Sequence, residues 1–247
     1  MLINSIKINC NNDYKKKSLP FKSWKREVRT NTLINRNDTS FFRDGDLFTK
    51  LIDYLVKFFK NDSKVNIYNY GCSIGEEAYS VLMYLISKFP EDIVNKFTPI
   101  TAKDIDNFVI KKAINNDPHI ICSEEKENIN KFTNNKLNHF LEYKNGQYII
   151  RDILKNKLDF RVADIKEDYK NINPNKSVVL MRNFLPYLNN STERQKLLNN
   201  IGHQLQKDSF IMIGEFDLRG TDWKINNQII DAGFERTPVE YLFKKKD

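Results

Sequence analysis

Hydrophobic positions along the chain follow two alternating patterns. Short runs rich in apolar, β-branched or aromatic residues, typical of strands, occupy 65–70, 97–103, 157–163, 177–181, 209–214 and 239–244. Stretches with helical spacing or composition lie between most of them, at 46–60, 76–89, 107–115, 191–206 and 223–232. Strands that alternate with helices form a largely parallel sheet covered by helices. The pattern therefore predicts an α/β fold.

Two of these elements show most clearly which side is buried. The helix predicted over 46–60 carries one apolar face, formed by Leu47, Leu51, Tyr54, Leu55 and Phe58. The run 177–181 reads Ser-Val-Val-Leu-Met, which is typical of a parallel strand covered on both faces. We expect this strand in the middle of the sheet.

Residues 117–159 interrupt the alternation. A polar helix is expected around 124–131. After it, Asn145-Gly146 separates two apolar and aromatic runs, and Asn-Gly is the strongest short hairpin signal. The sequence thus predicts an antiparallel hairpin from Phe140 to Arg151, outside the parallel sheet. This hairpin either covers an edge of the sheet or contacts a partner protein.

The stretch 65–80 joins the first predicted strand to a helix through a short loop bracketed by Gly71 and Gly75. Such a junction presents backbone amides to a ligand at a helix N-terminus. The loop is too short for a P-loop, lacks its Lys-Ser/Thr ending, and is not the G-x-G-x-x-G dinucleotide fingerprint. Glu76, at the start of the helix, would repel a pyrophosphate and favour a cationic or hydroxyl-bearing ligand. A simple connecting turn is the alternative.

Polar residues also follow the other predicted strands, at Asp104, Asp164, Asn183 and Tyr187. In open α/β sheets, ligands bind at the carboxyl ends of the strands. A carboxylate at the tip of the strand after the glycine loop holds ribose hydroxyls in Rossmann-like folds, so we assign this role to Asp104. Helix capping is its alternative role, although Asp106 is the better placed cap.

The composition is that of a globular protein, with 40% hydrophobic and 29% charged residues among 247. No apolar run is long enough to cross a bilayer, and the first ten residues lack the apolar core of a signal peptide. Three cysteines at unrelated spacings indicate reduced thiols and no zinc site, so we expect a cytoplasmic protein without membrane insertion and without a metal. The histidines share no motif, and we expect structural or surface roles for His119, His139 and His203.

The net charge of +8 arises from scattered lysines, which indicates a solvated surface rather than a nucleic-acid site. Residues 1–35 show no sustained period. We expect them to form a short N-terminal arm or a truncated helical region, ahead of one domain over 36–247.

Five motifs, in order along roughly residues 36–215, resemble those of the chemotaxis receptor methyltransferases of the CheR type. They are an Asn-x-Thr-x-Phe-Phe-Arg run, the Gly-Cys-Ser-x-Gly-Glu-Glu-x-Tyr-Ser loop, the aspartate after the next strand, an Asp-Ile pair, and an Arg-Asn-x-x-x-Tyr run. The resemblance implies the Rossmann-like sheet of class I methyltransferases, with an antiparallel last strand and a small antiparallel β-subdomain inserted at about 132–158. It also implies S-adenosylmethionine as cofactor, with S-adenosylhomocysteine as product. By the same resemblance, the cofactor-binding residues are Asn37, Thr39, Arg43, Gly71, Glu76, Asp104, Asp164, Ile165, Asn183 and Phe184.

The activity implied by the resemblance is methylation of a protein glutamate to a methyl ester. A sulfonium methyl is already activated and an ionised carboxylate is already a nucleophile, so the enzyme has to supply alignment and desolvation. We expect Arg43 to hold the acceptor carboxylate in its planar fork, and Tyr187 to hydrogen-bond near the methyl group or the acceptor oxygen. The implied partner is a protein substrate, either a chemoreceptor or another signalling protein.

Two features depart from the family pattern. The family's N-terminal helical domain is expected to be absent or reduced to the arm, and 214–217 reads Gly-Glu-Phe-Asp where many members have a Gly-His-Ser-Glu-like run. Two alternatives therefore stay open: a methyltransferase of a nucleic acid or small molecule, and a non-catalytic module that binds the cofactor or a partner. The segment 183–186 does not match the Asn/Asp-Pro-Pro-Tyr/Phe motif of base methyltransferases, and a scaffold has no need of both Arg43 and Tyr187.

Overall fold

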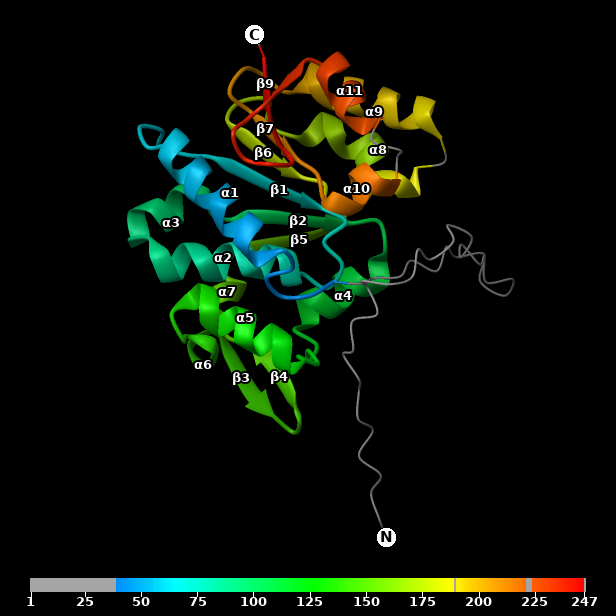
Figure 1. Ribbon diagram of the computed structural model, residues 1–247. Coiled ribbons are helices and arrows are strands. Elements are labelled where there is room, and N and C mark those ends of the chain that lie inside the picture. Colours follow the sequence, from blue (N-terminus) through cyan, green and yellow to red (C-terminus); the bar gives the residue numbers. More distant parts are fainter. Residues whose placement is uncertain (1–38, 189, 221–223, 247) are drawn as a thin grey trace, which may run out of the picture. The chain divides into compact units, whose positions relative to one another are not determined.

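The computed structural model describes residues 39–188, 190–220 and 224–246. Seven strands form the central sheet: β1 (Asn66–Tyr70), β2 (Ile100–Asp104), β5 (Leu158–Val162), β6 (Ser177–Leu180), β7 (Phe210–Met212), β8 (Phe234–Arg236) and β9 (Leu242–Lys245). Their order across the sheet is β5-β2-β1-β6-β7-β9-β8 (Figure 1). β1 pairs in parallel with β2 and β6, and β5 and β7 extend the parallel part. β9 runs antiparallel to both β7 and β8.

This topology confirms the predicted Rossmann-like α/β sheet with an antiparallel last strand. The strand expected over 65–70 is central, since β1 has a parallel partner on each side.

Helices connect the strands and cover both faces of the sheet (Figure 1). They are α1 (Gly45–Phe58), α2 (Glu76–Lys88), α3 (Glu91–Phe97), α4 (Asn107–Asn115), α5 (Ser123–Thr133), α6 (Leu137–Phe140), α7 (Asp152–Lys155), α8 (Ile165–Asp168), α9 (Ser191–Gln204), α10 (Glu215–Gly220) and α11 (Ile225–Asp231), with 3-10 turns η2 (Tyr169–Asn171) and η3 (Leu185–Tyr187). None of the helices in the described ranges is long and apolar enough to cross a membrane.

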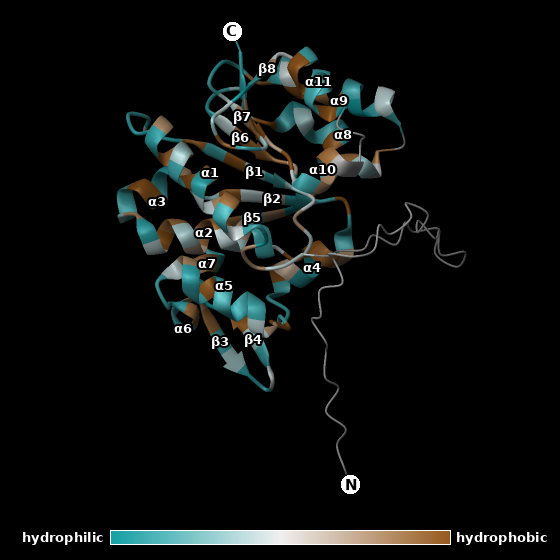
Figure 2. Ribbon diagram, viewed as in Figure 1, coloured by the Kyte–Doolittle hydropathy of each residue, from teal (hydrophilic) through white to brown (hydrophobic). Residues whose placement is uncertain are grey.

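Two hydrophobic clusters fill the space between the sheet and its helices. Around β6, Val178 and Leu180 belong to the cluster that includes α1 and α2, whereas Val179 and Met181 belong to the cluster that includes α9 and α11. Successive side chains of a strand point to opposite faces, so a strand covered on both sides is apolar throughout. Figure 2 shows hydrophobic residues concentrated along the central strands and hydrophilic residues on the outer helix surfaces.

The predicted hairpin forms a separate two-stranded sheet of β3 (Leu141–Lys144) and β4 (Gln147–Ile150). Asn145 and Gly146 both have positive φ, at 50° and 84°, as the tight turn between two twisted antiparallel strands requires. The hairpin thus lies outside the parallel sheet, as expected.

The strand predicted to begin at Phe97 begins instead at Ile100. Phe97 is the last residue of α3 and is 1% exposed. Pro90, which follows the helix predicted over 76–89, occupies the N-cap of α3, with φ −68°. A single large apolar residue before a strand has the same pattern whether it ends a helix or starts the strand, and packing against the core decides here.

Other boundaries also differ from the expected ones. The helix predicted over 191–206 ends at Gln204, and Asn190 caps it by accepting a hydrogen bond from the Glu193 amide at 2.9 Å. The strand expected from Val239 starts at Leu242. The short elements α10, of six residues, and β8, of three residues, were not predicted, because so few residues do not repeat a periodic pattern often enough to be recognised.

The buried face of α1 includes Leu51 and Leu55, as expected, but its other buried residues are Phe48 and Ile52. The remaining predicted members only partly pack against the core: Leu47, Tyr54 and Phe58. The apolar stripe of α1 is wider than the surface through which the helix contacts the sheet. The packing of α1 on the sheet therefore decides which of its apolar residues are buried.

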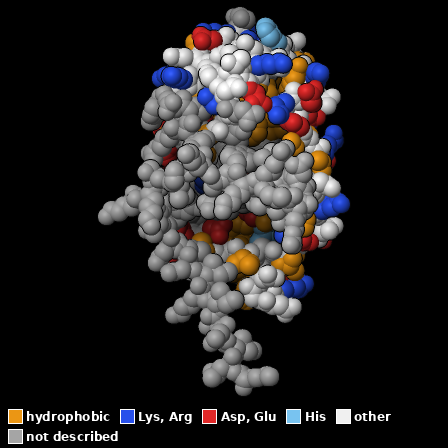
Figure 3. Space-filling model, turned by 90° about the vertical axis from the view of Figure 1, so that its right-hand side faces the viewer, with side chains coloured by type: hydrophobic (Ala, Val, Ile, Leu, Met, Phe, Trp, Pro, Cys, Tyr) orange, Lys and Arg blue, Asp and Glu red, His pale blue; other side chains and the backbone are white. Residues whose placement is uncertain are grey.

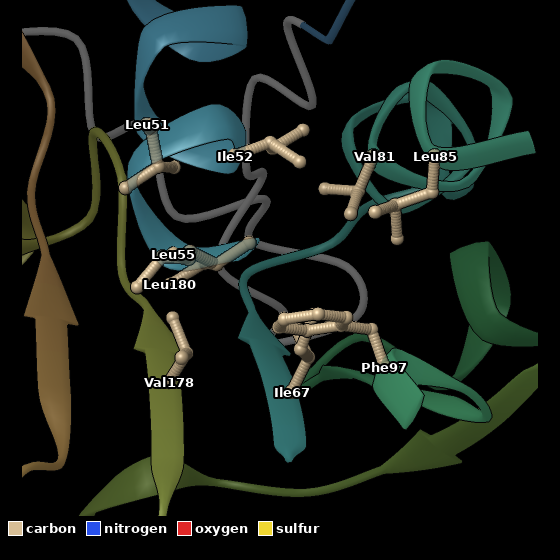
Figure 4. Close-up of a pocket in the computed structure, with 9 residues that line it drawn as sticks. All are labelled: Leu51, Ile52, Leu55, Ile67, Val81, Leu85, Phe97, Val178 and Leu180. Atoms are coloured by element: carbon tan, nitrogen blue, oxygen red, sulfur yellow. The ribbon is translucent and has the colours of Figure 1, made fainter. Parts of the chain in front are cut away.

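A small apolar cavity lies where α1 and α2 pack on β1 and β6 (Figure 4). It is lined by Leu51, Ile52, Leu55, Ile67, Val81, Leu85, Phe97, Val178 and Leu180. Its volume of about 10 Å³ is at the lower limit for one water molecule, and an apolar lining keeps such a space dry. This cavity is a packing gap and not a ligand site.

Gly202 in α9 lies against the backbone that follows α11, because a Cβ placed on it would be 2.1 Å from the Ala232 carbonyl oxygen. Alanine favours a helix over glycine by about 1 kcal/mol, but this contact forces the backbone to move. We expect Gly202→Ala to lower the free energy of unfolding by about 2 kcal/mol. Urea unfolding, monitored by circular dichroism, measures this change in the free energy of unfolding.

Lys196→Ala on the same helix is the control, because Lys196 is exposed. It should change the free energy of unfolding by at most about 0.5 kcal/mol. A Gly202→Ala variant as stable as this control would contradict the close packing of α9.

Candidate functional site

The carboxyl ends of four neighbouring parallel strands bring the predicted site residues to one edge of the sheet. Gly71 follows β1, Asp104 ends β2, Asp164 follows β5 and Asn183 follows β6. Figure 3 looks onto this side of the molecule, where acidic, basic and hydrophobic side chains all appear. Segments that are far apart in the sequence thus meet, as the rule for ligand sites in open α/β sheets predicts.

The glycine loop and Asp104 are joined directly. The Ser73 amide donates to Asp104 Oδ2 at 2.9 Å, and the Asp106 amide donates to Asp104 Oδ1 at 2.9 Å. Burial raises the pKa of the Asp104 carboxyl, although these amide hydrogen bonds lower it. Gly71 and Gly75 have φ of 70° and 103°, a region that favours glycine, so both glycines are required by the turn.

The ends of α4 and β5 support this arrangement. Asp106 caps α4 by accepting from the Phe108 amide at 2.8 Å, as expected. The Ala163 amide donates to the Asp104 carbonyl oxygen at 2.9 Å, which sets the following Asp164 beside the end of β2.

Glu76 is the first residue of α2 and is 6% exposed. Its Oε1 lies 3.0 Å from Nδ1 of His119, while its Oε2 is buried without a hydrogen-bond partner in the described part of the chain. A structural or surface role was expected for His119; its side chain is buried and paired with Glu76, a predicted cofactor residue.

The turn that carries Arg43 is held against the same edge by Arg182. The Arg182 guanidinium donates to Asp44 at 2.6 Å and to Glu77 at 2.9 Å, and its side chain is 1% exposed. It also donates to the carbonyl oxygen of Arg43 at 3.4 Å. Arg182 belongs to the predicted Arg-Asn-x-x-x-Tyr run, but sequence reasoning gave it no role; its position beside Asn183 was the available signal.

The Phe-Phe pair before Arg43 is fixed through its backbone. The Phe41 amide donates to Glu125 Oε1 at 3.0 Å, and the Phe42 amide donates to Ser80 Oγ at 2.9 Å. Both rings are buried, as expected for core residues. Arg43 is half-buried and is the third residue of this turn, which spans 41–44 directly before α1.

The loop after β6 depends on Asp217, a residue that sequence reasoning did not single out. The Asp217 carboxylate accepts hydrogen bonds from the amides of Asn183 at 2.7 Å, Leu185 at 2.8 Å and Gly214 at 2.6 Å. Asn183 has a positive φ of 59°, so its turn needs this support. Asp217 is the last residue of the Gly-Glu-Phe-Asp run, which thus keeps a carboxylate at its fourth position.

The remaining predicted residues are placed as follows. Asp164 caps α8 by accepting from the Lys166 amide at 2.9 Å, and the Ile165 side chain is 4% exposed in the core. Thr39 and Phe184 are partly buried, Tyr187 ends η3, and Asn37 lies outside the described residues.

Four buried side-chain atoms at this edge have no hydrogen-bond partner among the described residues: Asn69 Oδ1, Ser73 Oγ, Glu76 Oε2 and Arg182 Nε. Leaving a buried polar atom unpaired costs about 1–3 kcal/mol, so such atoms are uncommon unless a ligand or water completes them. Their positions on β1, the glycine loop, α2 and the end of β6 fit a polar ligand with a cationic group. No cluster of three or more potential metal ligands occurs in the part of the chain that is described.

Comparison with known proteins assigns the chain to a family. The family model described as "CheR methyltransferase, SAM binding domain" matches residues 37–226. The chain belongs to the CheR methyltransferase family. S-adenosylmethionine is therefore its cofactor, and the unpaired atoms at the edge of the sheet fit that amino-acid-bearing nucleoside.

Two curated CheR relatives are similar to this chain. The "Chemotaxis protein methyltransferase" of Borreliella burgdorferi is 27% identical over 194 residues, which cover 76% of this chain and 66% of the relative. "Chemotaxis protein methyltransferase 2" of Vibrio cholerae is 23% identical over 185 residues, which cover 72% and 61%. The chain thus spans only part of each relative. Among solved structures, a TehB-like SAM-dependent methyltransferase from Corynebacterium glutamicum is 13% identical with a TM-score of 0.42, covering 81% of this chain and 88% of that one.

The buried carboxylate of Asp217 generates a pH-dependent prediction. Burial raises its pKa from 3.8 to about 6. Between these values the folded protein binds a proton that the unfolded chain releases, so the contribution of Asp217 to stability rises as the pH falls. From about pH 7 to about pH 5 we expect a gain of about 1 kcal/mol for wild type relative to Asp217→Asn.

Urea unfolding of both proteins at the two pH values measures this difference, and the other titrating groups cancel because they are common to both. A wild-type advantage that is independent of pH, or that shrinks on acidification, would contradict the raised pKa.

Proposed function

We propose that this protein transfers the methyl group of S-adenosylmethionine to a glutamate side chain of a second protein, its substrate. We further propose that the substrate is a chemoreceptor. The family match over 37–226 and the names of the two relatives support the proposal. The observation on the chain itself that carries it is the bridge made by Arg182, the residue before Asn183. Its guanidinium binds the Arg43 turn and also Glu77, in the first turn of the helix that follows the glycine loop. An acceptor held by Arg43 would therefore lie beside the cofactor.

The proposed cofactor contacts follow from charge and hydrogen-bonding capacity. The unpaired Oε2 of Glu76 accepts from the ammonium group of the amino-acid part. Each oxygen of Asp104 accepts one backbone amide and keeps a further lone pair for a ribose hydroxyl. The other proposed members of the pocket are Asn37, Thr39, Arg43, Gly71, Asp164, Ile165, Asn183 and Phe184.

The bound cofactor supplies a methyl group on a positively charged sulfur, which an ionised carboxylate attacks directly. The residues of the chain therefore have to orient the acceptor and exclude water. A planar guanidinium holds a carboxylate through two parallel hydrogen bonds, which is the role we propose for Arg43. Tyr187, in the turn after Asn183, is the second proposed catalytic residue.

The cofactor assignment predicts a specific loss of affinity. Asp104→Ala removes the proposed ribose contact, so affinity for S-adenosylhomocysteine should fall about 30-fold, equivalent to about 2 kcal/mol. Titration calorimetry measures this. Because the same carboxylate accepts two backbone amides, the melting temperature is recorded in parallel.

Asp106→Ala is the matched control, since Asp106 caps α4 two residues away and is not among the proposed contacts. It should lose about 1 kcal/mol of stability while its affinity changes less than about twofold. An Asp104→Ala variant with wild-type affinity would remove Asp104 from the site.

The chemistry predicts the nature of the product. A methyl ester hydrolyses in mild base and releases methanol, whereas methylated amines and most methylated bases do not. Radiolabelled transfer to candidate chemoreceptors, followed by alkali treatment, should therefore give base-labile label. Arg43→Ala should lower the rate by about 100-fold or more, far more than it lowers cofactor affinity, and Tyr187→Phe should lower the rate less.

Arg43→Lys is the control for geometry. A lysine keeps the charge but not the planar fork, so it should not restore activity. Alkali-stable label would rule out the carboxylate and point to a nitrogen acceptor. Base-labile label with full activity of Arg43→Ala would keep the ester and remove Arg43 from its role.

A further inference from the structure

His119 lies between α4 and α5 and is 4% exposed. Its ring packs edge-on against Phe41 at 5.5 Å and against Tyr79 at 6.3 Å, measured between ring centroids. Its Nδ1 lies 3.0 Å from Oε1 of Glu76. The imidazole is therefore enclosed between the Phe-Phe-Arg turn and the helix that follows the glycine loop.

The backbone of His119 forms a bridge to strand β4 of the hairpin. Its amide donates to the Tyr148 carbonyl oxygen at 2.7 Å, and its carbonyl oxygen accepts from the Tyr148 amide at 2.9 Å. Three residues earlier, the Asn116 side chain donates to the Ile150 carbonyl oxygen at 3.0 Å and accepts from the Ile150 amide at 3.3 Å. The small antiparallel sheet thus anchors the imidazole that touches Glu76.

The Glu76 carboxylate is held at one oxygen only. Oε1 is paired with His119, whereas Oε2 is buried and unpaired in the described ranges. A carboxylate with no fixed partner rotates about its last bond, and a buried one in the wrong orientation cannot accept from a ligand. A donor at Oε1 therefore determines where Oε2 lies.

We propose that His119 is a positioning residue for cofactor binding: its Nδ1–H holds Glu76 so that Oε2 is available to the ammonium group of S-adenosylmethionine. This inference rests on the proposed contact between Glu76 and that group. It also gives the hairpin a function, because hairpin hydrogen bonds fix the backbone of the residue that orients Glu76.

The test compares three substitutions of His119. Two of them place a hydrogen-bond donor at different distances from the backbone, and the third has no donor. His119→Asn places an amide N–H near the position of Nδ1, His119→Gln places it farther out, and His119→Phe keeps an aromatic ring without a donor. Each is titrated with S-adenosylhomocysteine and with 5′-methylthioadenosine, which has the nucleoside but no amino-acid part.

His119→Phe and His119→Gln should each bind S-adenosylhomocysteine about tenfold more weakly than wild type. His119→Asn should stay within about threefold of wild type. All three should bind 5′-methylthioadenosine within about twofold of wild type, because it makes no contact with Glu76. His139→Ala is the control histidine variant, since His139 is exposed and contacts Phe140, and it should bind both ligands normally.

Equal losses of affinity for both ligands would show that His119 only maintains the fold. Unchanged affinity of His119→Phe and His119→Gln for S-adenosylhomocysteine would show that Glu76 needs no partner at Oε1. Either result overturns the proposal. If His119→Phe does not fold, the comparison of His119→Gln with His119→Asn gives the same decision. A wild-type protein that binds neither ligand would instead contradict the cofactor assignment, and methyl transfer to another acceptor would leave this inference intact.

Discussion

The parallel pairing of β1 with β2 on one side and β6 on the other is the constraint on which the site depends. Because the three strands point the same way, the glycine loop, Asp104 and the Asn183 loop all emerge at one edge. The apolar run of β6 makes this arrangement stable, since it is buried against helices on both faces. Reversing one of these strands would move its site residue to the opposite end of the sheet.

At that edge, charged side chains rather than regular structure hold the loops. Asp104 accepts backbone amides of the glycine loop and of the α4 cap, and Asp217 does the same for the loop after β6. Arg182 holds the turn of Arg43 through Asp44 and Glu77. Burying such a charged group costs free energy. The several hydrogen bonds that each of these side chains makes offset that cost.

The Gly-Glu-Phe-Asp run shows how a departure from a family pattern is explained by structure. Its aspartate stands where the family's Gly-His-Ser-Glu-like run has a glutamate, and its carboxylate binds three backbone amides. The difference at this fourth position therefore concerns a residue that supports the Asn183 loop. It does not by itself argue against a cofactor site at this edge.

The sequence by itself determined six of the seven strands of the central sheet, the longer helices between them, the hairpin turn at Asn145-Gly146, and the motifs that identify the CheR family. Periodicity, turn chemistry and short motifs are local properties. The sequence also placed Gly71, Asp104, Asp164 and Asn183 at one edge of the sheet, since each of them ends or follows a predicted strand. The roles of His119, Arg182 and Asp217 were decided only by the tertiary structure, because their partners lie 43, 138 and 34 residues away along the chain. Packing likewise decided that Phe97 ends a helix, since an isolated apolar residue fits either element until its neighbours are in place.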